Sequence, residues 1–133
     1  MIVVDASVVA ELLTRAPGAA VASARVLAPG EDLHAPHLID LEVTSVLRRS
    51  VAAKTATAAA AAKALDALMA FPIQRHGHEE LLARIWRLRG NLTPHDAAYV
   101  ALAEALEVPL VTFDRNLARA PGNRATMELL QRP

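Results

Sequence analysis

Several residue types are absent or scarce in this chain of 133 residues, and each shortage excludes a kind of site. The chain has no cysteine, which excludes disulfide frameworks, thiolate metal ligands and cysteine nucleophiles and fits a reducing, cytoplasmic environment. Lys54 and Lys63 are the only lysines, so phosphate contacts would fall to arginine, although compositional bias explains the preference equally well. The formal net charge is +0, so any binding of nucleic acid must come from local patches.

Long uncharged apolar runs are also missing. Charged residues interrupt every apolar stretch well before the roughly 18 residues that a membrane span requires. The first residues, Met1 to Val4, carry no basic leader, so we expect no secretory signal. An apolar fraction of 53% nevertheless excludes a disordered chain, and the length suits one compact domain. We therefore expect a single domain over residues 1–133.

Short apolar runs alternate with helical periodicities along the chain. We predict strands at residues 2–4, 32–35, 73–75 and 110–112, and helices at residues 6–13, 19–27, 38–53, 57–70, 79–89 and 94–107. Residues 125–130 fit either an edge strand or a helix. Alternating strands and helices predict an α/β fold with a parallel sheet covered on both faces, and such sheets bind ligands beyond the carboxyl ends of their strands.

Four acidic residues are expected at that edge of the sheet. Asp5 directly follows the first strand, and Asp114 follows the strand at residues 110–112. Asp96 lies in the first turn of a helix, and Glu42 lies on a helix predicted to be half-buried. Each acid taken singly has a plainer explanation, because Asp96 complements the helix dipole, Asp114 caps a turn and Glu42 is solvated.

Carboxylates gathered at one place need a cation. Two unit charges about 4 Å apart repel by roughly 4 kcal/mol at an effective dielectric of 20. Mg²⁺ or Mn²⁺ suits a cluster of oxygen ligands without cysteine better than zinc does. A hard cation that activates water and stabilises a leaving oxygen hydrolyses phosphodiesters, so the acids predict a metal-dependent nuclease.

Neighbouring polar residues are candidates for supporting roles. Ser7 and Thr112 each lie two residues from an acid and could orient it by hydrogen bonds, although a helix cap and a β-branched strand residue explain them equally well. A group of arginines flanks the segments that carry Asp96 and Asp114, and we predict that some of them hold RNA phosphates. These arginines are Arg84, Arg87, Arg89, Arg115 and Arg119.

The histidines offer a rival site. His76 with His78, or His34 with His37, could form a zinc ligand pair, but surface loops explain both pairs better. His95 adjoins one of the acids and could touch a substrate, yet its position on the helix is expected to point it away from them.

The large aromatic residues are predicted to belong to the core. The helix at residues 79–89 is expected to bury Leu82, Ile85, Trp86 and Leu88. Tyr99 falls on a helix face that is also expected to be buried. This placement argues against an aromatic platform on which RNA bases stack.

At this point the sequence resembles the PIN-domain pattern. The resemblance lies in Met-Ile-Val-Val-Asp-Ala-Ser at residues 1–7, Glu42 in the third helix, Leu-Thr-Pro-His-Asp-Ala-Ala-Tyr at residues 92–99 and Val-Thr-Phe-Asp at residues 111–114. Its order and spacing are similar to the VapC toxins of bacterial type II toxin–antitoxin modules over nearly the whole chain. The resemblance implies a three-layer α/β/α sandwich and a Mg²⁺- or Mn²⁺-dependent endoribonuclease. The metal-binding and catalytic acids that it implies are Asp5, Glu42, Asp96 and Asp114.

The resemblance also implies partners. It implies an RNA substrate, a homodimer and a VapB-type antitoxin that lays an amphipathic segment over the toxin. The apolar helices between Leu38 and Met69 offer a surface for that segment, although core packing explains about half of their apolar residues. The family commonly has a polar or acidic residue two positions after the last acid. Asn116 stands there, and its amide could bind a metal-bound water but adds no charge, which leaves one or two metals open.

Other functions fit the sequence less well. A phosphoacceptor receiver domain needs a lysine at a strand end, whereas Lys54 and Lys63 lie in helical stretches. A haloacid-dehalogenase-type phosphatase needs a second acid two residues after its nucleophile, where this chain has Ser7. The serious alternative is a catalytically idle PIN-like interaction or regulatory subunit, and the complete set of acids argues against it.

Overall fold

A five-stranded sheet of order β3-β2-β1-β4-β5 forms the centre of the computed structural model, which describes residues 1–133. All neighbouring strands are parallel. The strands are β1 (Ile2–Val4), β2 (Leu33–Pro36), β3 (Ile73–His76), β4 (Leu110–Thr112) and β5 (Met127–Leu129). The predicted α/β class is therefore confirmed, and the ambiguous residues near the C-terminus form an edge strand.

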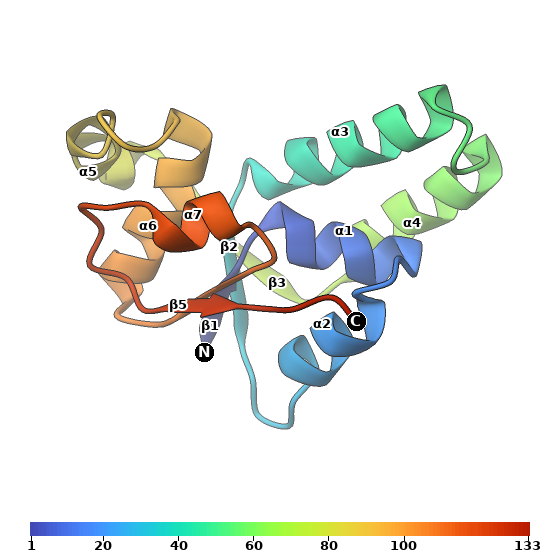
Figure 1. Ribbon diagram of the computed structural model, residues 1–133, viewed down its shortest axis with the longest axis horizontal. Helices are drawn as coiled ribbons and strands as arrows, with labels where there is room; N and C mark the ends of the chain where they lie inside the picture. Colours follow the sequence, from blue (N-terminus) through green and yellow to red (C-terminus); the bar gives the residue numbers. More distant parts are fainter.

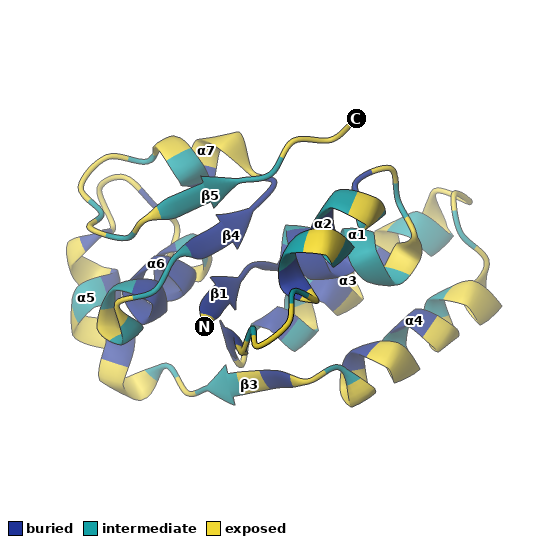
Figure 2. Ribbon diagram, turned by 90° about the horizontal axis from the view of Figure 1, so that it is seen from below, coloured by how far each residue is buried: buried dark blue, intermediate teal, exposed yellow.

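Helices cover both faces of this sheet (Figures 1 and 2). One side carries α1 (Ala6–Thr14), α2 (Ala19–Val26), α3 (Ile39–Ala52) and α4 (Ala58–Ala70), and the other carries α5 (Leu82–Arg87) and α6 (Pro94–Leu106). The short α7 (Arg115–Arg119) packs beside β4 and β5. None of these helices combines the length and the apolar character needed to cross a membrane.

Helix α6 packs directly on the central strands of the sheet, and its buried side is built largely from alanine. Every residue from Ala97 to Ala103 is buried, and the helix contacts both β1 and β2. Small side chains let a helix approach a sheet closely, and Thr93 caps the N-terminus by accepting a hydrogen bond from the backbone N–H of Asp96 at 3.2 Å. The first turn of α6 is therefore firmly held at the edge of the sheet.

The predicted helix at residues 79–89 differs in both extent and orientation. It is divided into a 3₁₀ turn, η1 (Glu79–Leu81), followed by α5. Ile85 and Leu88 are buried as expected, but the prediction that Leu82 and Trp86 are buried is wrong, since they are 55% and 66% exposed. Two helical faces of this segment are apolar, and only one of them can face α6, so periodicity alone could not choose between them.

The segment after β4 also differs from the prediction. The plainer alternative for Asp114 was that it caps a turn, and it does act as a cap, but of a short helix, because residues Arg115–Arg119 form α7. Asp114 is its N-cap and accepts hydrogen bonds from the backbone N–H groups of Asn116 and Leu117 at 2.8 and 3.2 Å. Leu117 is buried and packs this short helix against the sheet.

Candidate active site

The carboxyl end of the sheet carries a cleft. Pairing of Val4 with Val111 aligns β1 and β4 in parallel, so the residues that follow them emerge side by side. Asp5 follows β1 directly, and its backbone N–H donates to the carbonyl of Val111 at 3.3 Å. The strand register therefore places Asp5 beside Thr112 and close to the turn that carries Asp114.

The four predicted acids all stand at the beginnings of helices. Asp5 is the N-cap of α1, and Asp114 is the N-cap of α7. Glu42 lies in the first turn of α3, and Asp96 lies in the first turn of α6. The structure brings these four side chains into the lining of one cleft. The positive ends of four helix dipoles point toward it, which eases the repulsion among the carboxylates.

Asp5 is the most constrained of these acids. Its Oδ1 accepts hydrogen bonds from the Ser7 hydroxyl at 2.6 Å and from the backbone N–H of Val8 at 3.2 Å, and its Oδ2 accepts one from the Thr112 hydroxyl at 2.5 Å. Both hydroxyls are themselves oriented by the backbone. Ser7 accepts from the N–H of Phe113 at 3.1 Å, and Thr112 accepts from the N–H of Asp114 at 2.9 Å. Each hydroxyl thus accepts from the backbone and donates its proton to the Asp5 carboxylate, which in its ionised form can only accept.

Glu42 presents a buried oxygen that makes no hydrogen bond of ordinary length. Its Oε1 is inaccessible to solvent, and so is the hydroxyl of Tyr99 in the same cleft. The two side chains nevertheless lie near enough for Tyr99 to lower the pKa of Glu42, against the larger effect of burial. Burial and the nearby charge of Glu42 raise the pKa of Tyr99, so its hydroxyl stays protonated. An unsatisfied buried carboxylate oxygen is costly, and a bound cation would satisfy it.

The cleft carries four acids that form no ion pair, although Arg49 also lines it. The six ion pairs of the molecule use other acids, and none includes Asp5, Glu42, Asp96 or Asp114. Burial raises the pKa of Asp5 to about 6, against the hydrogen bonds from Ser7 and Thr112. Burial also raises the pKa of Glu42, and the charge of Asp96 adds to this effect. Burial and then the charge of Asp114 raise the pKa of Asp96.

These features fit a hard divalent cation, although no coordination sphere is preassembled. No three of the acidic and histidine side chains converge closely enough to form one. The donor set nevertheless consists of carboxylate oxygens alone, which is the chemistry that Mg²⁺ and Mn²⁺ prefer. Glu42 Oε1 makes no hydrogen bond, and the acids of the cleft form no ion pair, so their charge is free to bind a cation.

Further residues of the cleft went unnoticed in the sequence. Arg49 lines it from α3, and its spacing of seven residues from Glu42 is the helical signal that could have revealed it. Tyr99, predicted as core, also lines the cleft. His95 was expected to point away from the acids, but it contributes to the wall of the cleft. That expectation is wrong because the first turn of α6 faces the cleft with more than one of its side chains.

The five arginines predicted to hold phosphates lie in different settings. Arg84 forms a two-point ion pair with Glu104 through hydrogen bonds of 2.6 and 3.0 Å. Arg89 lies over the ring of Trp86, 4.3 Å from its centroid. The other three are exposed and make no ion pair, and none of the five lines the cleft. These three are Arg87, Arg115 and Arg119.

The remaining polar candidates lie away from the acids. Asn116 donates its backbone N–H to Asp114, but its side chain is not part of the cleft lining. The histidines pair differently from the sequence prediction, because His34 Nδ1 and His76 Nε2 are 2.9 Å apart across β2 and β3. This distance is a direct hydrogen bond between two imidazoles. Burial, followed by the charge of His76, lowers the pKa of His34.

The sequence matches a known protein family and individual relatives over nearly its whole length. The family model described as PIN domain matches residues 2–123. Ribonuclease VapC1 of Mycobacterium tuberculosis is 42% identical over 130 residues, which cover 97% of each chain. The match therefore includes every element that contributes to the cleft.

Solved structures show the same fold at low sequence identity. Mycobacterium tuberculosis VapC20, described as a sarcin-ricin loop cleaving toxin, superposes with a TM-score of 0.71 at 16% identity over 89% of this chain and 93% of that chain. VapBC2 from Rickettsia felis, bound to a DNA fragment from its promoter, gives a TM-score of 0.70 at 14% identity over 97% and 98% of the two chains. At such identities these structures bear on the fold alone.

Proposed function

The chain belongs to the PIN-domain family, and from this premise we propose that it is the ribonuclease toxin of a toxin–antitoxin module, an endoribonuclease that uses Mg²⁺ or Mn²⁺. One observation carries the proposal. Asp5, Glu42, Asp96 and Asp114 share a single cleft, and none has a basic partner. An idle interaction subunit would have no need of such an uncompensated charge.

The side chains of the cleft would have different roles in binding the cation and the RNA. Asp5 would be the fixed ligand, since three donors hold its two oxygens. Glu42 would offer its unpartnered Oε1, and Asp114 would offer Oδ2, because its Oδ1 already accepts two backbone N–H groups. A divalent cation, when bound, lowers the pKa of water and offsets negative charge on a phosphodiester. Arg49 at the rim suits a neighbouring phosphate of the RNA.

Cleavage of RNA by the purified chain tests the proposal. A short unpaired RNA is incubated with Mg²⁺, with Mn²⁺ or with a chelator, and the ends of the fragments are sequenced. We expect cleavage at defined positions with either cation and none with the chelator. Binding of RNA or of the antitoxin without cleavage under any of these conditions would favour the idle subunit.

Adding Mg²⁺ should stabilise the protein, and more strongly at neutral than at acidic pH. A tenfold excess over Kd adds about 1.4 kcal/mol, or roughly 4 °C in Tm for a domain of this size. The pKa values of Asp5, Glu42 and Asp96 are raised in the folded chain, so ionisation of these acids lowers the stability of the metal-free fold. This loss is complete once the pH has passed the folded pKa, which is about 6 for Asp5. A bound cation offsets the loss. We therefore expect a rise of several degrees at pH 7.5 and a much smaller one at pH 5. Equal shifts at both pH values, measured by thermal unfolding, would contradict this assignment.

Arginines that contact phosphates should be visible in the salt dependence of RNA binding. We expect Arg49→Ala and Arg115→Ala each to reduce the slope of log K against log salt by about 0.7 to 1. Arg84→Ala is the matched control, because Arg84 is held by Glu104 and should alter stability without altering the slope. Equal slopes for all three variants would place the basic contact surface elsewhere.

We also propose a VapB-type antitoxin and a second copy of this chain as partners. The names of the relatives support the antitoxin. An apolar depression between α3 and α4, lined by Leu47, Val51, Ala61 and Leu65 among others, suits the apolar face of an amphipathic helix. Loss of antitoxin binding in Leu65→Glu tests this surface, and sedimentation of the chain alone tests the homodimer.

A further inference from the structure

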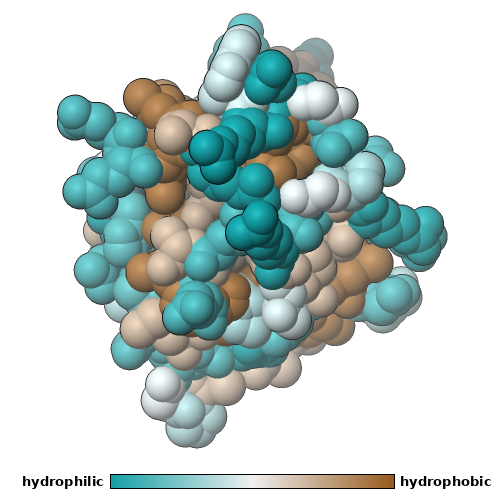
Figure 3. Space-filling model, turned by 90° about the vertical axis from the view of Figure 1, so that its left-hand side faces the viewer, coloured by the Kyte–Doolittle hydropathy of each residue, from teal (hydrophilic) through white to brown (hydrophobic).

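A second, mostly apolar pocket adjoins the carboxylate cleft. It has a volume of about 200 Å³ and opens on the side of the molecule formed by η1, α5 and α6, whose surface mixes apolar and strongly hydrophilic patches (Figure 3). Leu38 and His95 line both this pocket and the cleft, so the two spaces adjoin across these side chains. An extended ligand held in the cleft lies next to the entrance of the pocket.

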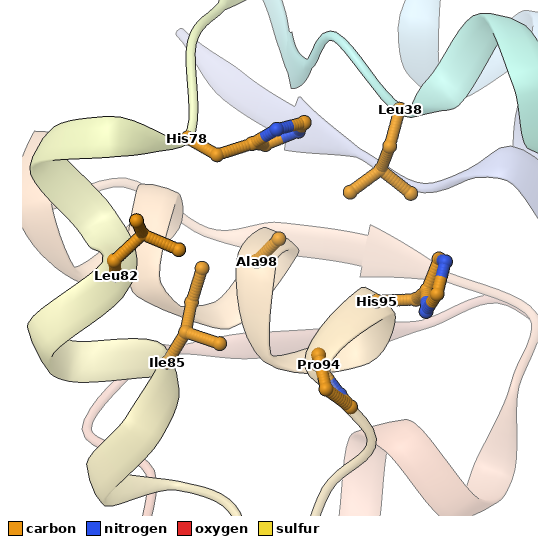
Figure 4. Close-up of a pocket in the computed structure, with 7 residues that line it drawn as sticks. All are labelled: Leu38, His78, Leu82, Ile85, Pro94, His95 and Ala98. Carbon is orange, nitrogen blue, oxygen red and sulfur yellow. The ribbon is translucent and has the colours of Figure 1, made fainter.

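The pocket combines apolar walls with unused polar groups. Leu82, Ile85 and Ala98 form its walls, and the imidazole of His78 points across it toward Leu38 (Figure 4). His78 Nε2 is buried and has no hydrogen-bond partner. A buried ring nitrogen without a partner is costly in a free-standing apolar pocket, so this atom indicates a ligand that brings a hydrogen-bonding edge.

We propose that this pocket binds a nucleobase of the RNA next to the phosphate held at the carboxylates, with His78 contacting the edge of the base. The inference rests on the proposed ribonuclease function and names the part of the substrate that the site selects. Apolar walls accept the faces of a base, and ring nitrogens read its edge. A base enters such a pocket only when it is unstacked, so the preferred substrate is an unpaired segment of RNA.

An apolar side chain from a protein partner fits these observations less well. It would fill the walls but would leave His78 Nε2 without a hydrogen bond. The position of the pocket beside the acids also favours the molecule that carries the scissile phosphate. Leu82 is 55% exposed in the free chain, as expected for a wall that a substrate covers.

Removing the base and removing the imidazole should have effects that are not additive. Cleavage is measured on a short RNA and on copies that carry an abasic residue at each position flanking the cleaved bond. In the wild-type chain we expect one abasic position to lower kcat/KM by about tenfold, the size typical of a lost base contact. In His78→Ala the same position should have a clearly smaller penalty, because only the contacts with the apolar walls remain to be lost. His37→Ala is the control, because His37 is exposed and lines neither space, and it should keep the full abasic penalty.

A binding measurement separates failure of the pocket from failure of the proposed function. The imidazole signals of His78 and His95 are followed by NMR while each of the four common ribonucleosides is added, with ribose as the control. We expect at least one nucleoside, and not ribose, to shift the His78 signals. Equal abasic penalties in wild type and His78→Ala would overturn the inference. If the wild-type chain cleaves no RNA, the ribonuclease proposal fails, and the NMR titration then tests base binding by itself. Unchanged imidazole signals in that titration would overturn the inference that the pocket binds a base.

Discussion

Asp96→Asn is expected to lower the rate of RNA cleavage by roughly a hundredfold or more, equivalent to about 2.7 kcal/mol of lost transition-state stabilisation. The substitution is informative because the Asp96 side chain does not cap its helix. That role belongs to Thr93, whose hydroxyl accepts the hydrogen bond from the backbone N–H of Asp96. Asparagine keeps this backbone contact and nearly the same shape. A loss of activity would therefore report the loss of a charged ligand and not the loss of a helix terminus.

The stability of the same variant gives the second half of the test. Burial and the charge of Asp114 raise the pKa of Asp96, so its ionised form destabilises the metal-free fold at neutral pH. Without metal, Asp96→Asn should melt at the parent's temperature or slightly above it. Asp66→Asn, on the exposed side of α4, is the control and should leave both activity and Tm unchanged. Full cleavage activity in Asp96→Asn would remove Asp96 from the proposed site.

Thr112→Val should affect both stability and activity although it preserves shape. The Thr112 hydroxyl is fully buried, donates to Asp5 and accepts from the backbone N–H of Asp114. Valine leaves both groups without this partner, at a cost of about 2–3 kcal/mol, or roughly 10 °C in Tm. Because the lost hydrogen bond favours the ionised form of Asp5, its pKa should rise further. The rate of cleavage should fall about tenfold at neutral pH and recover partly at higher pH.

Thr112→Ser distinguishes this explanation from a simple packing defect. Serine keeps the hydroxyl and removes only a methyl group, which costs about 1 kcal/mol in a buried site. We expect it to retain near-normal cleavage and the parental pH–rate profile. If serine and valine lowered activity equally and left the profile in the same place, the hydroxyl would have no role in holding Asp5.

Much of the fold and part of the candidate site could be predicted because their signals are local. Short runs rich in β-branched residues marked β1 and β4 at their observed bounds, and the stretch before Pro36 marked β2 within one residue. Thr93 and Pro94 marked the start of α6, since an N-cap and a proline at the first helical position act through the backbone of neighbouring residues. Asp5 and Asp114 could be placed at one edge because parallel strands deliver their ends to the same side of a sheet.

The choices between helix faces depended on packing between distant segments. The apolar residues of α5 allowed two orientations, and contact with α6 buried Ile85 while it left Trp86 exposed. No local rule distinguishes two apolar faces on a short helix, because the decision rests on which of them the neighbouring helix covers.

The sequence by itself determined which acids form the site and in what order they occur. It also determined the parallel α/β fold that carries them and the absence of cysteine. What only the tertiary structure decided was which further groups face those acids. Arg49 lines the cleft from the last turn of α3, and His95 lines it from the first turn of α6. Their place depends on how whole helices are set by packing in the core, and that packing sums contacts between residues far apart in the chain.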